Sequence, residues 1–332
     1  MLRMIVFVLF ILVVLLSSAW AVLALWYQLP WPAPLRAGVC TGWAILALMA
    51  VWLVWSGRAW PGAGLYILMF AVLMIWWGRL DPSHDRQWAD DLAHITTGQV
   101  QGDIVTLENV RNFTWRTQED YDVRWETRRF DLSRLRSVDL ITSEWGMPGI
   151  AHILVSFGFD DGEFITFTVE IRRERNESFS AIGGFFKQFE LNVLATDEND
   201  AVRVRSNVRG EATHIYRVTM PETAMRDLFM AYVDEANELA GEARFYHTVT
   251  ANCTIIVYNM MRRIVDGLPL DHRLLLSARL PEYVKDVGGL EDEPLQELRA
   301  RGDFTERARA IEDGEDFSQV IRRGVPGWTD QP

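Results

Sequence analysis

AHILVSFGFDDGEFITFTVEIRRE, residues 151–174, is the stretch that decides the fold of this 332-residue chain. β-Branched and aromatic residues fill both halves, and Asp160-Asp161-Gly162 separates them, so the pattern predicts two strands joined by a tight turn. If these three residues form the loop, with the glycine in the left-handed conformation, the antiparallel register follows. Opposed residues keep a constant index sum, which places His152 opposite Glu170.

The predicted register also separates the two faces of the hairpin, because side chains alternate along each strand. A two-residue Asp161-Gly162 turn is the alternative, and it would shift the register by one residue and move His152 and Glu170 to opposite faces. The three-residue loop predicts the cross-strand pairs Leu154 with Thr168 and Ser156 with Thr166. It also predicts an apolar face made of Ile153, Val155, Phe157, Ile165, Phe167 and Val169.

A second informative stretch is FYHTVTANCTIIVYNMMRRIVDG, residues 245–267, which contains Cys253. Asn252 is a helix-capping residue type, apolar residues recur at helical spacing after it, and Gly267 is placed as a C-terminal cap. The pattern predicts that a helix begins at the cysteine, where the positive end of the helix dipole favours the thiolate. A lone cysteine is also frequently an inert core residue, and this alternative remains open.

Together, these two stretches predict a thiol acyl-transfer site. Cys253 would be the nucleophile, His152 the base and Glu170 the residue that orients the imidazole. The order His, Glu, Cys is the reverse of papain-type enzymes, in which the cysteine helix comes first. It resembles the circularly permuted papain-like proteins, such as the lecithin–retinol acyltransferase family, and the opening ANCTIIVYNMMR supports this resemblance.

Much of the chain from about residue 88 to 260 resembles the Lnb N-terminal periplasmic domain family. The resemblance rests on NVRNFTWRTQEDYDVRWETRRFDL, AHILVSFGF, FTVEIRRE, GGFFKQFELNVLATDEND and FYHTVTANCT. It implies lipid acyl transfer at a bacterial membrane, because the family takes its name from an enzyme that moves an acyl chain within lipoproteins. His152 and Cys253 match the family's motifs, whereas Glu170 follows mainly from the hairpin register. His247 stands where the family pattern has asparagine, which argues against an obligatory role.

Residues 1–79 contain four arginines and no acidic residue, and they are predicted to cross a membrane three times, at about 4–26, 38–55 and 64–77. The Ala19-Trp20-Ala21 segment resembles a signal-peptidase site, but the apolar run continues past it and favours an uncleaved anchor. The arginines do not decide the orientation, since two fall on each side. The family resemblance implies a multi-pass protein of the bacterial inner membrane with its globular domain in the periplasm, where Cys253 would be a free thiol.

Charge limits the choice of partners. The chain has 33 basic and 45 acidic residues, and four basic ones precede residue 80, so the remainder carries 29 against 45, a net charge of −16. This balance disfavours nucleic-acid binding. A membrane lipid or lipoprotein is the substrate that the family resemblance implies. Arg172, Arg111 and Arg116 are candidates for binding lipid phosphate, and ion pairing with neighbouring carboxylates is the alternative. We find no zinc-ligand spacing and no nucleotide-binding motif, so no metal or cofactor is expected.

The element pattern predicts an α+β domain with an antiparallel sheet and helices over residues 80–290, and the family resemblance implies a permuted papain-like fold for it. Within it we expect a helix at 81–99, strands in 98–116 and 137–145, and an amphipathic helix at 221–241. Residues 291–332 are predicted as a charged C-terminal extension, either short helices packed on the domain or a loose tail.

The predicted function is therefore that of a membrane-anchored periplasmic thiol acyltransferase or hydrolase acting on a lipid or lipoprotein acyl group. A papain-like amidase or peptidase of the cell wall would use the same residues. A non-catalytic receptor or assembly module, in which the cysteine and histidine only pack, is the alternative from a different class.

Overall fold

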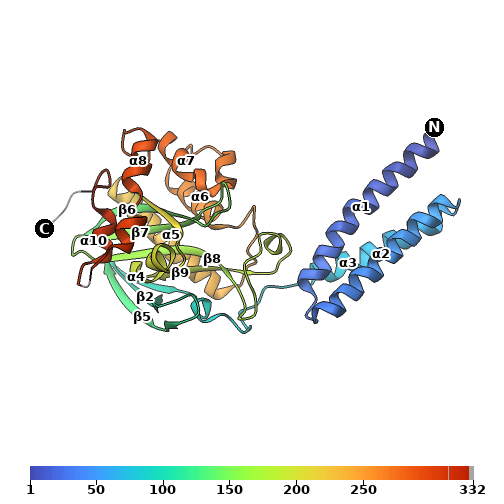
Figure 1. The fold of residues 1–332 in the computed structure, drawn as a ribbon, viewed down its shortest axis with the longest axis horizontal. Coiled ribbons are helices and arrows are strands. Elements are labelled where there is room, and N and C mark those ends of the chain that lie inside the picture. The colour runs from blue at the N-terminus through green and yellow to red at the C-terminus, as the bar shows by residue number, and fades with distance from the viewer. Residues whose placement is uncertain (313, 329–332) are drawn as a thin grey trace. The chain divides into compact units, whose positions relative to one another are not determined.

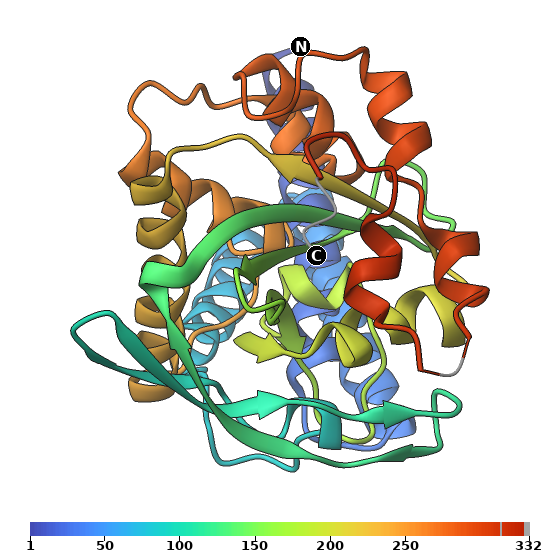
Figure 2. The ribbon, with the colours of Figure 1, turned by 90° about the vertical axis from the view of Figure 1, so that its left-hand side faces the viewer.

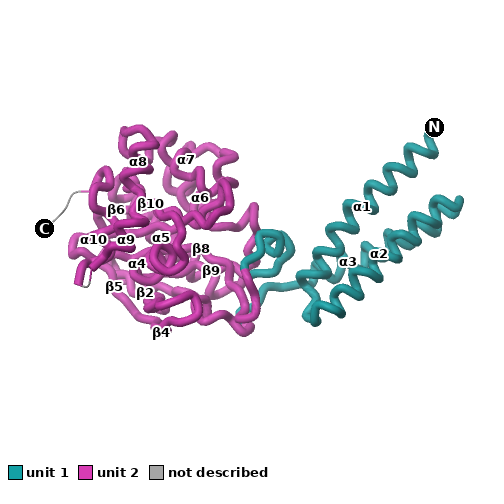
Figure 3. Tube along the Cα trace, viewed as in Figure 1, with its two compact units in different colours: residues 1–84, 179–189 teal, residues 85–178, 190–332 magenta. Residues whose placement is uncertain are grey.

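The computed structural model describes residues 1–312 and 314–328, and the chain forms two compact units (Figure 3). The first unit contains residues 1–84 together with the short segment 179–189. The second unit contains residues 85–178 and the chain from 190 onward. The segment 179–189 therefore belongs to the unit of the N-terminal helices, although it lies between two strands of the second unit in sequence.

The first unit consists of three apolar helices: α1 (Leu2–Gln28), α2 (Ala33–Trp55) and α3 (Ala59–Gly78) (Figure 1). All three are long and apolar enough to cross a membrane. The helix α3 is longer than the sequence pattern predicted, because it already begins before Pro61, and proline is tolerated in the first turn of a helix. Ala21, Ala47, Ala50 and Tyr66 are buried where the three helices pack together.

The second unit is built on one sheet with the strand order β1-β2-β9-β8-β7-β6-β10, and β5 also pairs with β2. All the pairings are antiparallel except the single parallel contact between β2 and β9. The fold class is therefore α+β with an antiparallel sheet, as predicted. The strands of this sheet are β1 (Thr97–Gln101), β2 (Ile104–Arg111), β5 (Trp125–Asp131), β6 (Leu135–Glu144), β7 (His152–Phe159), β8 (Phe164–Arg172), β9 (Glu190–Thr196) and β10 (Ala212–Val218); β3 (Thr114–Trp115) and β4 (Tyr121–Asp122) form a separate small pair.

The hairpin of β7 and β8 has the predicted three-residue turn and register. Gly162 adopts φ +83°, a conformation that glycine tolerates best, and the Phe159 N–H donates to the Glu163 carbonyl at 2.9 Å. The observed pairs include Leu154 with Thr168 and Ser156 with Thr166. The alternative two-residue turn is excluded, and the polar side chains of both strands share one face.

Helices cover both faces of the sheet (Figure 2). The helices α5 (Glu222–Gly241) and α6 (Cys253–Ile264) pack on the apolar face of the hairpin, where Phe157, Phe167 and Phe229 are fully buried. The other face is covered by α4 (Glu198–Arg203), the π-helix Val204–Val208, α9 (Thr305–Arg309) and α10 (Phe317–Arg322). The helices α7 (Leu280–Asp286) and α8 (Leu295–Gly302) enclose a smaller apolar cluster beside α6.

The segment 81–99 is not a helix, contrary to the prediction from its sequence. It contains only one short turn, Asp90–Leu92, and it enters β1 at Thr97. Tertiary contacts satisfy its backbone instead of helical hydrogen bonds: Trp88 forms a β-bridge with Glu174, and Arg172 donates to the carbonyls of Leu92 and Ala93 at 3.0 and 2.8 Å. A local helical pattern contains no information on contacts with Arg172, which lies in a strand about 80 residues later in the sequence.

The C-terminal residues fold back on the sheet through a buried charge cluster. The fully buried Arg322 of α10 donates to Asp139 at 2.8 Å and to both carboxylate oxygens of Glu198 at 2.8 and 2.7 Å. It also donates to Ser156 on β7 at 3.2 Å, and Arg217 donates to the other oxygen of Asp139 at 2.6 Å. Of the two alternatives for residues 291–332, the described part thus forms short packed helices.

Replacing Arg322 with methionine should destabilise the second unit by about 3–5 kcal/mol, because Asp139 and Glu198 would be left buried with too few positive partners. The loss of stability is measured as the change in melting temperature of the detergent-solubilised chain. The matched control is Arg323→Met, since that side chain is 57% exposed and pairs with Glu315 at the surface. Equal melting temperatures for the two variants would show that the cluster does not hold α10 in place.

Candidate functional site

The helix α6 begins at Cys253, as the sequence predicted. The Asn252 side chain accepts hydrogen bonds from the backbone N–H groups of Thr254 and Ile255 at 3.0 and 2.8 Å. This capping pattern leaves the N–H of Cys253 itself without a hydrogen bond to any described residue. A backbone donor therefore sits beside the thiol at the positive end of the helix.

The thiol of Cys253 lies against strand β7. The backbone N–H of Ile153, the residue next to His152, points to the sulfur and favours its thiolate form. Covalent geometry then keeps the Cα atoms of His152 and Cys253 within about 10 Å of each other. The cysteine is partly buried between the two apolar clusters that flank α6. The structure thus brings together residues that are 101 positions apart in the sequence.

His152 is held by a short chain of hydrogen bonds on the polar face of the hairpin. Its Nε2 lies 2.6 Å from the Thr168 hydroxyl and 3.1 Å from Glu170 Oε1, and Thr168 donates its proton to the same oxygen at 3.1 Å. Because Thr168 has only one proton to give, Nε2 must be the donor of the imidazole. The neutral ring therefore carries its lone pair on Nδ1.

Arg205 is the residue of this network that the sequence analysis missed. It lies in the π-helix Val204–Val208 and donates to Glu170 Oε1 at 3.0 Å and to the Ala201 carbonyl at 2.8 Å. Its guanidinium is buried with the carboxylate. No local pattern marks this arginine, because its partner is 35 residues away and is reached only when α4 folds over the sheet.

The electrostatics of the site follow from burial and from these charges. Burial raises the pKa of Glu170, but His152 and Arg205 outweigh this effect and hold that pKa well below its usual range. Burial lowers the pKa of His152, and the Glu170 carboxylate opposes the shift. The resting site therefore contains a neutral imidazole that is hydrogen-bonded to an ionised carboxylate.

The acidity of Cys253 differs from the prediction. A helix N-terminus alone favours the thiolate, yet burial raises the pKa of the thiol above its ordinary value, and the N–H of Ile153 only partly offsets the shift. Within the described residues, no hydrogen bond joins the thiol to the His152 ring. Burial therefore favours the neutral thiol of Cys253, as it favours the neutral imidazole of His152.

Two tyrosines complete the surroundings of the thiol. Tyr232 of α5 and Tyr246, just before α6, pack with Cys253 on the apolar core, and burial raises the pKa of both phenols. They stay protonated at neutral pH and therefore remain possible hydrogen-bond donors. No signal in the sequence distinguishes these two tyrosines from core residues, because aromatic side chains at helical spacing usually indicate core packing.

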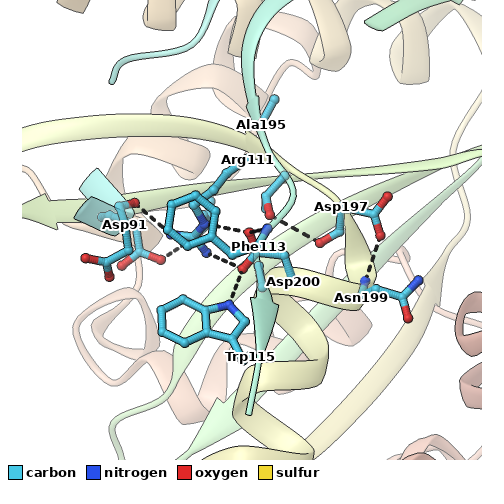
Figure 4. A network of polar contacts seen from close by, with 12 residues as sticks. Asp91, Arg111, Phe113, Trp115, Ala195, Asp197, Asn199 and Asp200 are labelled. Carbon is cyan, nitrogen blue, oxygen red and sulfur yellow. Dashed lines mark hydrogen bonds and ion pairs between the residues drawn. The ribbon is translucent and has the colours of Figure 1, made fainter. Parts of the chain in front are cut away.

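Arg111 does not present a free guanidinium, contrary to its predicted role as a phosphate ligand (Figure 4). It is buried and donates to both carboxylate oxygens of Asp200 at 2.9 and 3.1 Å, and to the Asp91 carbonyl at 2.9 Å. Asp200 also accepts from the Phe113 N–H and the Trp115 indole, each at 2.8 Å. The bidentate ion pair ties β2 to α4 and uses the donors that phosphate would require.

Arg172 and Arg116 are also engaged with other partners. The buried guanidinium of Arg172 bonds to two backbone carbonyls and stacks on the Trp88 ring at 4.2 Å, and burial lowers its pKa to about 10. Arg116 is exposed and pairs with Asp120 at 2.6 Å and Asp122 at 2.7 Å. Arg111 and Arg116 thus form the ion pairs that the alternative described, and Arg172 holds the segment 81–99. Phosphate binding by these arginines stays a prediction.

These features define a class: an α+β domain attached to apolar helices, with a cysteine at a helix start and a strand histidine supported by a carboxylate. Residues 121–278 match the Lnb N-terminal periplasmic domain family, which is the family that the sequence resembled. The match runs from β4 to the segment before α7 and includes His152, Glu170 and Cys253. No curated protein and no solved structure matches the chain at a significant level.

Alkylation of Cys253 by iodoacetamide should rise with pH through a midpoint above the ordinary thiol value of about 8.5, because burial disfavours the thiolate. The rate is measured on the full chain in detergent with Cys40 replaced by serine. Acid-shifted reactivity, with a midpoint below that of a model thiol, would show that the helix start and His152 outweigh burial.

The pKa of His152 should respond in opposite directions to its two charged neighbours. Arg205→Met should raise it by removing a positive charge, whereas Glu170→Gln should lower it by removing the charge that stabilises the imidazolium. The readout is an NMR titration of histidine ring signals, assigned with His152→Gln. Arg203→Met is the control, since this arginine is exposed on the preceding turn and should leave the titration unchanged. A shift of the same sign in both variants would contradict the network.

Proposed function

We propose that the chain is a membrane-anchored acyltransferase or hydrolase that uses Cys253, His152 and Glu170 on an acyl group of a membrane lipid or lipoprotein. The observation that carries this proposal is the position of the Cys253 thiol beside the strand residue that follows His152, with the ring held in one tautomer by Thr168 and Glu170. A cysteine that served only for packing would not need a polarised histidine next to it.

The proposed chemistry begins with transfer of the thiol proton to Nδ1 of His152. The sulfur attacks the ester carbonyl carbon, a C–S bond forms, and the carbonyl oxygen becomes an oxyanion. The free N–H of Cys253 would donate to this oxyanion. The C–O bond then breaks, and the imidazolium returns its proton to the leaving alkoxide. An amine or water, deprotonated by His152, then attacks the thioester and releases the thiol.

Glu170 supports this chemistry through its charge. It stays ionised because His152 and Arg205 lower its pKa, and it stabilises the imidazolium that the first step creates. A raised thiol pKa is compatible with this role, since proton transfer to His152 can accompany the attack instead of preceding it. We therefore place Arg205 as a positioning residue, because it acts on the reacting groups only through Glu170.

A lipid or lipoprotein substrate is proposed because the domain is joined to three helices that are able to cross a membrane and because the matched family is periplasmic. The location that follows is a multi-pass protein of the bacterial inner membrane with a periplasmic domain. A cell-wall amidase would use the same three residues on an amide. A receptor module would use none of them.

The intact mass of the chain purified from membranes should include a species that carries one acyl group on Cys253, since a thioester persists when the acceptor is scarce. Hydroxylamine at neutral pH should remove this mass. The variants Cys253→Ala and His152→Ala should lack the adduct, and Cys40→Ala should keep it because that cysteine lies in α2.

Analysis of cells that lack Cys253 distinguishes the acyltransferase or hydrolase from the cell-wall amidase and from the receptor module. Loss of Cys253 should change the acyl chains of phospholipids or lipoproteins if the proposal is correct. A change confined to cell-wall fragments would assign the site to an amidase. No change in either, together with normal behaviour of Cys253→Ser cells, would support the receptor module and overturn the enzymatic proposal.

A further inference from the structure

We propose that the segment 179–189, between β8 and β9, is a bilayer-contact loop that lies in the interfacial layer of the membrane. It belongs to the same compact unit as the three apolar helices, although the strands on both sides of it belong to the other unit (Figure 3). The proposal concerns where lipid touches the protein, and it does not depend on the chemistry of Cys253.

The loop packs on the ends of α1 and α3 through Phe186. The Phe186 ring is stacked on Tyr27 with the centroids 5.9 Å apart, and it also contacts Trp20 at 6.2 Å and Trp77 at 6.3 Å. The Gln28 side chain at the end of α1 donates to the Phe186 carbonyl at 2.6 Å. Tryptophan and tyrosine rings at the ends of apolar helices mark the level of the lipid headgroups, so the loop is held at that level.

Lys187 fixes the same loop to α3. Its ammonium donates to the carbonyls of Trp77 and Leu80 at 3.0 and 3.1 Å, and it lies 5.0 Å from the Trp77 ring centroid. A cation at the C-terminal end of a helix interacts favourably with the helix dipole and with carbonyls that have no partner within the helix. The loop is therefore attached at two helix ends, which both face the same side of the membrane.

The loop exposes three large apolar side chains around these attachment points. Phe179, Ile182 and Phe185 are 49%, 52% and 42% exposed. Moving apolar side chains out of water is favourable, so leaving all three exposed to water is unfavourable. Lipid next to the helix ends is the medium that covers them without any further protein.

The backbone of the loop limits how deep it reaches. Its regular part is the short turn Gly183–Phe185, and irregular backbone that is exposed to lipid does not occur within the hydrocarbon region. The headgroup layer offers water and polar groups for the backbone while it accepts apolar side chains. The geometry therefore points to shallow insertion, with the three apolar side chains reaching the boundary of the acyl chains.

A fluorescent probe on residue 182 tests the proposal. The full chain carries Ile182→Cys with Cys40→Ser and Cys253→Ser, is labelled with an environment-sensitive dye, and is reconstituted in vesicles of phosphatidylethanolamine and phosphatidylglycerol. We expect emission shifted to the blue, and quenching about twofold stronger by nitroxides near the headgroup than by nitroxides at the bilayer centre. The matched control is Val123→Cys, because Val123 is 54% exposed in the second unit and should show neither effect.

Three outcomes would overturn the proposal. The probe on residue 182 could stay as unquenched as the probe on residue 123, which would place the loop in water. Quenching could be strongest at the bilayer centre, which would make the segment part of the spanning region. A blue shift without nitroxide quenching, which grows as the protein-to-lipid ratio rises, would assign the loop to contacts between two copies of the chain. None of these three outcomes depends on catalysis, since the labelled variants carry Cys253→Ser.

Discussion

The antiparallel register of β7 and β8 is the constraint on which the rest of the second unit depends. It collects the aromatic and β-branched side chains on one face, where α5 and α6 cover them, and the polar side chains on the other. A shift by one residue would exchange these faces along both strands. The register also brings Nε2 of His152 within 3.1 Å of Oε1 of Glu170. These two residues of the site therefore come together when the sheet forms.

The polar face creates a second requirement, because it is buried and its charges need partners. The segment 198–208 takes part in three such pairs: Glu198 pairs with Arg322 of α10, Asp200 with Arg111 of β2, and Arg205 with Glu170 of β8. Removing one partner of a buried pair leaves an uncompensated charge, which costs several kcal/mol. Three ion pairs therefore hold this segment over the sheet. The pair between Arg205 and Glu170 also lowers the pKa of Glu170 and keeps its carboxylate ionised beside His152.

Buried hydrogen bonds and ion pairs also engage two of the arginines that were predicted to bind phosphate. The sequence places Arg172 within the predicted hairpin, but it contains no information on whether the donors of Arg172 or Arg111 are already used. In the structure, Arg111 holds α4 and Arg172 holds the segment 81–99. The cysteine thiol illustrates a related point, because the helix start is a local property, whereas the burial that raises its pKa is produced by distant parts of the chain.

Local pattern was sufficient for the three apolar helices, the turn at Gly162, the facing of His152 and Glu170, and the start of α6 at Cys253. Each depends on residues that are close in sequence or joined by one short turn, so periodicity and turn chemistry determine them. The position of Cys253 on β7, the pairing of Arg205 with Glu170 and the return of α10 onto the sheet depend on contacts over 35 to 183 residues. Only tertiary structure decided these contacts, because the partner of a buried charge is selected by which elements pack together and not by any signal in its own neighbourhood.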